Sequence, residues 1–78
     1  MKKTIFVVEA GWVFLAEDYE TTADAYRLKT ASVIRIWGTS YGLGQIALHG
    51  PTGDTVLDPC GTPDIPRNKV LFILPCTY

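Results

Sequence analysis

The residues best suited to binding chemistry are gathered between positions 35 and 45. They comprise one cation, two aromatic rings, two hydroxyls and one amide: Arg35, Trp37, Thr39, Ser40, Tyr41 and Gln45. An arginine can hold a phosphate, and a Trp or Tyr ring can carry a stacked base, a contact worth on the order of 1–3 kcal/mol. The amide of Gln45, one helical turn after Tyr41, can read a base edge. These residue types favour a site for a small anionic nucleotide.

Thr39 and Ser40 stand where the N-cap of a short helix is expected. The first turn of a helix leaves N–H groups without partners, and such an end attracts anions. Arg35 and Trp37 are two residues apart, so on an extended strand both would face the same side. We therefore expect phosphates at the helix start, with Arg35 supplying charge. A purely structural interpretation stays open, in which the hydroxyls only cap, Trp37 is a core residue and Arg35 is a solvated strand residue.

The expected helix contains two glycines and has a clear end. Its apolar face is formed by three residues at helical spacing: Leu43, Ile46 and Ala47. Gly42 and Gly44 each cost about 1 kcal/mol relative to alanine. Either they allow close approach of a strand, a second subunit or a ligand, or the helix begins near Leu43 and Gly42 belongs to the loop. Gly50-Pro51 predicts the end of the helix.

Alternating apolar residues predict strands on both sides of this helix. The expected strands cover residues 3–9, 12–18, 25–37, 55–57 and 70–74. Ala10-Gly11 is typical of a hairpin turn, and residues 21–24 form the next turn. Thr30-Ala31-Ser32 disturbs the alternation and predicts a bend or bulge. The Pro/Gly-rich stretch 59–66 is expected to hold no regular element.

These elements predict an α+β fold. It is a small, bent antiparallel sheet or partly open β-barrel of about five strands, with one short helix at one end. With 78 residues the chain forms a single domain, spanning 1–78, that is too small to enclose a deep active site. A hydrophobic content of 47% in so short a chain indicates apolar surface left over for self-association, so we expect a homo-oligomer.

Charge and hydropathy exclude several classes of protein. The net charge is −1 and no basic run follows Lys2-Lys3, so we expect no DNA or RNA partner. Glu9 interrupts the N-terminal apolar run too early for a signal peptide, and no segment approaches membrane-spanning length. The sequence therefore predicts an intracellular protein with no membrane partner.

Catalytic and metal chemistry have little support in the sequence. Cys60 and Cys76 have the spacing of neither a disulfide framework nor a redox motif, and are expected to be reduced. The single histidine, His49, lies at the helix end, where the dipole favours a cation without any catalytic role. We expect a non-enzymatic protein with no catalytic residues, no metal site and no cofactor.

Several short patterns resemble a group of small uncharacterised proteins of phages and prophages. They are Ile36-Trp37-Gly38-Thr39, Gly42-Leu43-Gly44-Gln45-Ile46-Ala47, Gly50-Pro51-Thr52 and Ile73-Leu74-Pro75-Cys76-Thr77. The resemblance implies a phage accessory protein acting in the host cytoplasm. Small β-rich phage oligomers of this size include sponges that sequester cyclic-dinucleotide or cyclic ADP-ribose immune signals, to which this chain is similar in scale and chemical requirements.

Two functional hypotheses follow. The first is a non-enzymatic binder that sequesters such a nucleotide signal to counter host defence. The second is a protein-binding inhibitor or structural interaction module, acting through a sheet edge or through the acidic surface of Glu17, Asp18 and Glu20. The acidic stretch can equally be a solvated strand face.

Overall fold

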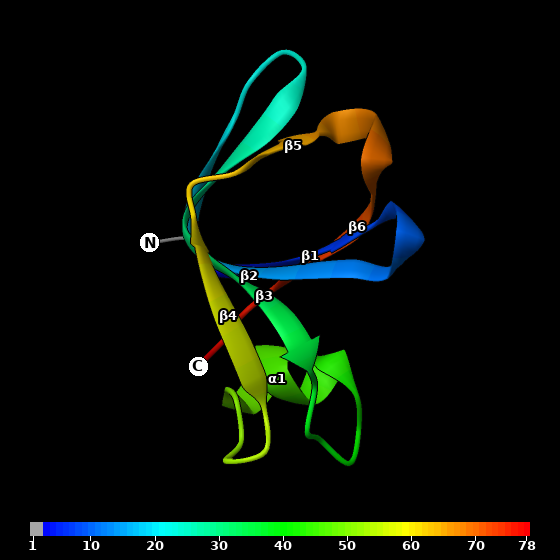
Figure 1. The fold of residues 1–78 in the computed structure, drawn as a ribbon, viewed down its shortest axis with the longest axis vertical. Helices are drawn as coiled ribbons and strands as arrows, with labels where there is room; N and C mark the ends of the chain where they lie inside the picture. Colours follow the sequence, from blue (N-terminus) through cyan, green and yellow to red (C-terminus); the bar gives the residue numbers. More distant parts are fainter. Residues whose placement is uncertain (1–2) are drawn as a thin grey trace.

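Six strands, one α-helix and two short 3₁₀-helices follow one another in residues 3–78, the part of the chain that the computed structural model describes (Figure 1). The strands are β1 (Thr4–Val8), β2 (Trp12–Thr21), β3 (Ala25–Ile36), β4 (Val56–Gly61), β5 (Asp64–Pro66) and β6 (Val70–Pro75). The helix is α1 (Leu43–His49), and the 3₁₀-helices are η1 (Glu9–Gly11) and η2 (Arg67–Lys69). In these residues no helix has the length and apolar character needed to cross a membrane.

All strands belong to one antiparallel sheet with the order β4-β3-β2-β1-β6. β5 pairs with β3 as well, beyond the end of β4 on the same side. β6 pairs with β1 and not with β4 or β5, so the sheet is bent but not closed into a barrel (Figure 1). The expected small antiparallel sheet with one helix is confirmed, and the barrel alternative is not what the chain forms.

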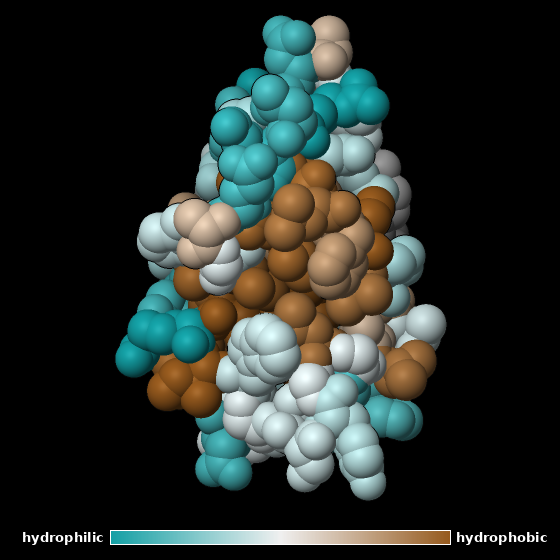
Figure 2. Space-filling view, turned by 90° about the vertical axis from the view of Figure 1, so that its right-hand side faces the viewer, coloured by the Kyte–Doolittle hydropathy of each residue, from teal (hydrophilic) through white to brown (hydrophobic). Residues whose placement is uncertain are grey.

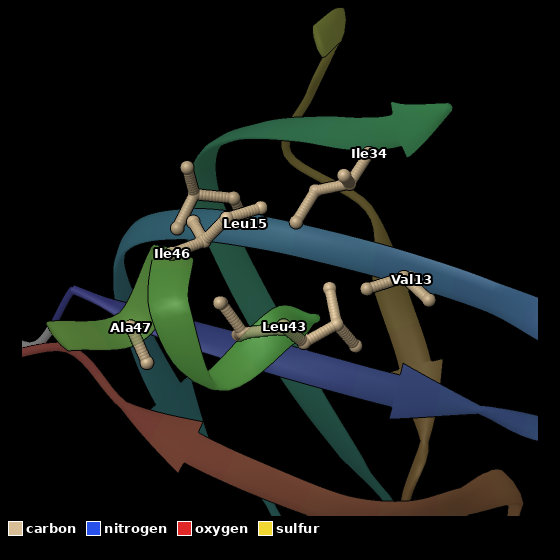
Figure 3. Packing of buried hydrophobic residues seen from close by; sticks show 7 residues of the cluster. Val13, Leu15, Ile34, Leu43, Ile46 and Ala47 are labelled. Carbon is tan, nitrogen blue, oxygen red and sulfur yellow. The ribbon is translucent and has the colours of Figure 1, made fainter. Parts of the chain in front are cut away.

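One face of the sheet is covered by α1. Figure 3 shows side chains of β2 and β3 pointing toward the apolar face of the helix. The buried residues of this helix-side cluster are Ile5, Val13, Leu15, Ile34, Leu43, Ile46 and Ala47. Ile46 is fully buried, which explains why the short helix forms, since packing of an apolar face stabilises a short helix more than its intrinsic propensity does.

The other face is covered by the sheet itself as it bends. Phe6 is fully buried there, and its ring centroid lies 5.1 Å from that of Tyr19 and 5.2 Å from that of Tyr26. The buried residues of this second cluster are Phe6, Val8, Ala16, Leu28, Ala31 and Ile65. The β2–β3 hairpin and β5 thus fold over β1 at the upper end of Figure 1, away from α1.

The bend lies where the sequence predicted it. Leu28 and Ala31 are three residues apart and yet bury into the same cluster, so the in-out alternation shifts by one residue between them. Thr30 has φ 49°, in the left-handed region, and the register with β4 shifts between Ala31 and Ser32. The disturbed alternation at residues 30–32 therefore marks a bend at Thr30, whereas the register with β2 continues unbroken and the extra residue at the β3–β4 shift is Cys60 of β4.

The expectation of an irregular connection over residues 59–66 is wrong. β4 continues to Gly61, and β5 occupies Asp64–Pro66. Pro59 is tolerated because β4 lies on the outside of the sheet, where a missing N–H leaves no partner unsatisfied. β5 is held by burial of Ile65 and by the ion pair from Arg27 Nε to Asp64 Oδ1 at 2.9 Å.

Candidate functional site

The start of α1 differs from the sequence prediction. The N-cap is Gly42, with φ 77° and ψ −159°, and no side chain caps the helix. The Thr39 hydroxyl donates instead to the Gly42 carbonyl at 2.8 Å. The prediction that Thr39 and Ser40 cap the helix is wrong, because the chain turns through a left-handed conformation at residue 42 that glycine adopts most readily. The alternative in which Gly42 belongs to the loop and the helix begins at Leu43 is confirmed.

Gln45 supplies an acceptor to the loop in front of the helix. Its Oε1 accepts hydrogen bonds from the backbone N–H groups of Ser40, at 3.2 Å, and Tyr41, at 3.0 Å. These are two of the donors that an anion would need. The Gln45 amide is thus engaged in holding the loop, and an anion bound here would have to displace it.

Trp37 and Tyr41 lie in the same loop region and are both exposed, by 44% and 86%. The Trp37 ring lies 3.7 Å from the position that a Cβ on Gly42 would take, so the indole covers the turn into α1. Its carbonyl accepts a hydrogen bond from the Thr55 hydroxyl at 2.6 Å. Trp37 is therefore not a core residue, and it lies with four of the six expected site residues, namely Thr39, Ser40, Tyr41 and Gln45.

Arg35 is separated from that group by the sheet. Its Nε donates to Asp58 Oδ2 at 2.7 Å. Asp58 pairs with Val33, which pairs with Phe14, and Phe14 packs on the second cluster rather than under α1. Because paired residues of antiparallel strands share a face, Arg35 and Asp58 lie on the face opposite to the helix. Five expected site residues are brought together, and Arg35 is not one of them.

Arg35 instead lines an open cleft of about 560 Å³. Three segments form it: Ala10-Gly11-Trp12 at the η1–β2 junction, Val33-Ile34-Arg35 near the end of β3, and Asp58-Pro59-Cys60 in β4. Trp12 is 55% exposed and its ring stacks on that of Phe14, with centroids 6.5 Å apart. Sequence reasoning treated Trp12 only as a strand residue. No local sequence signal marks it, because it comes opposite Arg35 only through the β2–β3 register, two positions beyond the pair of Phe14 and Val33.

The cleft combines groups that can bind a flat polar molecule. Among residues 3–78, Arg35 and Asp58 are joined through Nε and Oδ2 only, which leaves both Nη groups and the second carboxylate oxygen for a ligand. The indole of Trp12 offers an apolar ring face. Partial burial raises the pKa of the Cys60 thiol above its usual value, so this sulfur is protonated at neutral pH and is a poor nucleophile.

The acidic stretch of β2 is largely neutralised. Glu17 Oε1 lies 3.8 Å from Lys3 Nζ, and Glu20 Oε1 lies 3.4 Å from Lys29 Nζ. Asp18 Oδ1 accepts the backbone N–H of Tyr19. Across residues 3–78, no group of three or more His, Cys, Asp or Glu side chains is arranged to hold a metal ion.

Comparison of the chain with known protein families, with curated proteins and with solved structures finds no match.

Proposed function

We propose that the protein is a non-enzymatic binder of a small anionic nucleotide, and that the ligand lies in the cleft beside Trp12. The observation that carries the proposal is the convergence of the exposed Trp12 ring, the Arg35 guanidinium and the Asp58 carboxylate on one open cleft. It retains Arg35 from the sequence prediction and replaces Trp37 by Trp12 as the stacking surface.

The chemistry of the cleft suits the parts of a nucleotide. A base stacks on the Trp12 indole, and the free oxygen of Asp58 accepts from an exocyclic amino group of the base. The Nη groups of Arg35 donate to a phosphate, for which the guanidinium fork is well matched. The Arg35–Asp58 ion pair is exposed, with side chains 61% and 49% accessible. Such pairs contribute about 0–1 kcal/mol, so a phosphate can compete for the arginine.

The biological role that we propose for this binding is sequestration of a cyclic-dinucleotide or cyclic ADP-ribose signal by a phage accessory protein in the host cytoplasm. It rests on the resemblance to small phage proteins described above. The open cleft fits a protein that holds its ligand and performs no reaction on it, since the one thiol in the cleft is not activated.

The two tryptophans provide a matched test of where the ligand lies. Calorimetric titration with cyclic di-GMP, cyclic ADP-ribose and AMP measures the affinity of the unmodified protein, of Trp12→Leu and of Trp37→Leu. We expect Trp12→Leu to weaken binding of the tightest nucleotide by about 5- to 150-fold, the equivalent of one lost stacking contact, and Trp37→Leu to leave it unchanged.

Two results would contradict the proposal. If Trp37→Leu abolishes binding and Trp12→Leu does not, the ligand lies at the start of α1. If none of the three nucleotides binds to the unmodified protein, nucleotide sequestration is overturned and the protein-binding alternative takes its place. The acidic surface is a poor candidate for that alternative because Lys3 and Lys29 neutralise two of its carboxylates.

A further inference from the structure

The two outer edges of the sheet differ sharply in chemistry. Edge strands of soluble proteins are protected from pairing with other chains by charges, prolines and glycines. β4 follows this rule, since its six residues include Asp58, Pro59 and Gly61. β6 does not, because the run Val70–Leu74 contains neither a charge nor a proline, and Pro75 comes only at its end. The β6 edge is therefore open to another strand.

The backbone of β6 has unpaired groups that point away from the sheet. The Cys76 N–H donates to the Lys3 carbonyl at 2.9 Å, and the same register continues through Leu74 with Ile5 and Phe72 with Val7. In an antiparallel pair, alternate residues face the partner strand, so the N–H and C=O of Ile73 face outward. Within residues 3–78 only β1 pairs with β6.

The side chains along β6 leave apolar surface in water. Leu71 is 63% exposed and Phe72 is 51% exposed. The side of the molecule seen in Figure 2 is hydrophobic over a broad central area and hydrophilic at its upper end. Unprotected backbone and exposed apolar side chains occur together on β6.

We infer that β6 is the dimer interface, and that it pairs antiparallel with β6 of a second copy about a two-fold axis at Ile73. Ile73 then exchanges two backbone hydrogen bonds with Ile73 of the second copy. In the same register Phe72 stands opposite Leu74 of the second copy, and each Leu74 stands opposite a Phe72. This apolar contact therefore occurs twice, once on each side of the two-fold axis.

The occupant is a second copy because β6 is complementary to itself. Its uncharged residues meet no like charge in the two-fold pairing. Pairing of β6 with the outer edge of β4 on another copy would generate an open filament, and Asp58 and Pro59 oppose that arrangement. A closed dimer is the arrangement that remains. This inference is independent of nucleotide binding, because no residue that lines the cleft belongs to β6.

The interface predicts a dimer that dissociates on dilution. Six-residue strands bury less than the roughly 1,000 Å² that a stable interface needs. Sedimentation velocity over about a hundredfold range of concentration should therefore show monomer converting to dimer. Leu71→Lys places a charge on the β6 edge and should keep the protein monomeric across the range. Leu48→Lys is the matched control, because Leu48 is 57% exposed on α1 and lies outside the interface.

Amide exchange provides a second readout that needs no variant. The Ile73 N–H should exchange quickly in the dilute protein and slow down as concentration rises, whereas the Leu74 N–H, which faces β1, should be protected throughout. An unmodified protein that stays monomeric at every concentration would overturn the inference. A dimer that persists in Leu71→Lys, with Ile73 exchange unaffected by concentration, would also overturn it, since the interface would then lie elsewhere.

Discussion

Arg35 and Asp58 are joined across β3 and β4 by a hydrogen-bonded ion pair of 2.7 Å, on the face of the sheet that α1 does not cover. The pair makes the cleft electrically neutral while leaving donors on one partner and an acceptor on the other. If the cleft binds the proposed nucleotide, we expect it to favour a ligand with both a polar edge and a negative group over a simple anion.

Replacing Asp58 tests whether its ion pair with Arg35 limits the binding of anions to the arginine. In Asp58→Asn the guanidinium of Arg35 loses its anionic partner and becomes fully available to phosphate. We expect the affinity for pyrophosphate to rise by up to about fivefold, because an exposed ion pair is worth up to about 1 kcal/mol. Calorimetric titration measures the affinity of each variant for pyrophosphate. Asp54→Asn is the control, since the exposed Asp54 does not line the cleft. Unchanged or weaker pyrophosphate binding in Asp58→Asn would count against Arg35 as the anion ligand.

Gly38 is the glycine least able to accept a side chain. It has φ 64°, and a Cβ there would collide with the backbone carbonyl group of Asp54. Gly38→Ala should therefore lower the free energy of unfolding by on the order of 3 kcal/mol. Gly44→Ala is the opposite case, because Gly44 lies inside α1 with open space around it. It should raise the free energy of unfolding by up to about 1 kcal/mol. Urea unfolding of both variants measures the change in the free energy of unfolding, which should be negative for Gly38→Ala and positive for Gly44→Ala. Equal changes in the two variants would contradict this prediction.

Gln45 should matter for stability more than its partial exposure indicates. Gln45→Ala removes the acceptor of the Ser40 and Tyr41 N–H groups. Both donors then turn to water, so we expect a loss of about 1 kcal/mol in the free energy of unfolding. Gln45→Glu keeps an acceptor at the same place and should retain most of the stability. If Gln45→Ala unfolds at the same urea concentration as the unmodified protein, the two hydrogen bonds contribute nothing.

The pair of Arg27 and Asp64 makes the attachment of β5 dependent on pH. The hydrogen bond from Arg27 holds the pKa of the Asp64 carboxyl below its usual range. A carboxyl with a lowered pKa in the folded state stabilises the protein above its unfolded pKa, about 3.9, and this contribution is lost as pH falls through the folded value. Asp64→Asn should therefore flatten the acid side of the stability curve below about pH 4. Thermal unfolding of the unmodified protein and of Asp64→Asn across that pH range checks the prediction. The same dependence of stability on pH in both proteins would contradict it.

Local pattern predicted the elements well, and it predicted the grouping of the expected site residues for all of them except Arg35. The alternation around Ile5 and Ile34 located strands, the phase break at Thr30 located the bend, and Gly50-Pro51 located the helix end, because each is decided by neighbouring residues. Strand pairing decides which side chains are brought together. Arg35 and Trp37 were expected to act together, but the pairing of β3 with β4 brings Asp58 to Arg35 on one face, while the loop turns Trp37 toward Gly42.

Trp12 lines the cleft although its local sequence does not predict this. Nothing near Trp12 in the sequence marks it as a binding residue, and it enters the cleft only through the register of β2 with β3 and of β3 with β4. The same long-range pairing converts the Pro/Gly-rich stretch into β4 and β5. Ile65 is buried against Leu28 and Phe6, a contact that local composition does not predict.

The pairing of β1 with β6 also has a consequence for the timing of folding. It joins Thr4 to Pro75, so β1 becomes an inner strand of the sheet only after β6, which lies far along the chain, has been made. Until then the nascent chain presents the β1 edge, with Ile5 and Phe6 beside it, to other chains. Closing so long a loop is slow compared with forming the β1–β2 hairpin. A growing chain of this protein is therefore exposed to misassembly at β1 until β6 has been made and has paired with it.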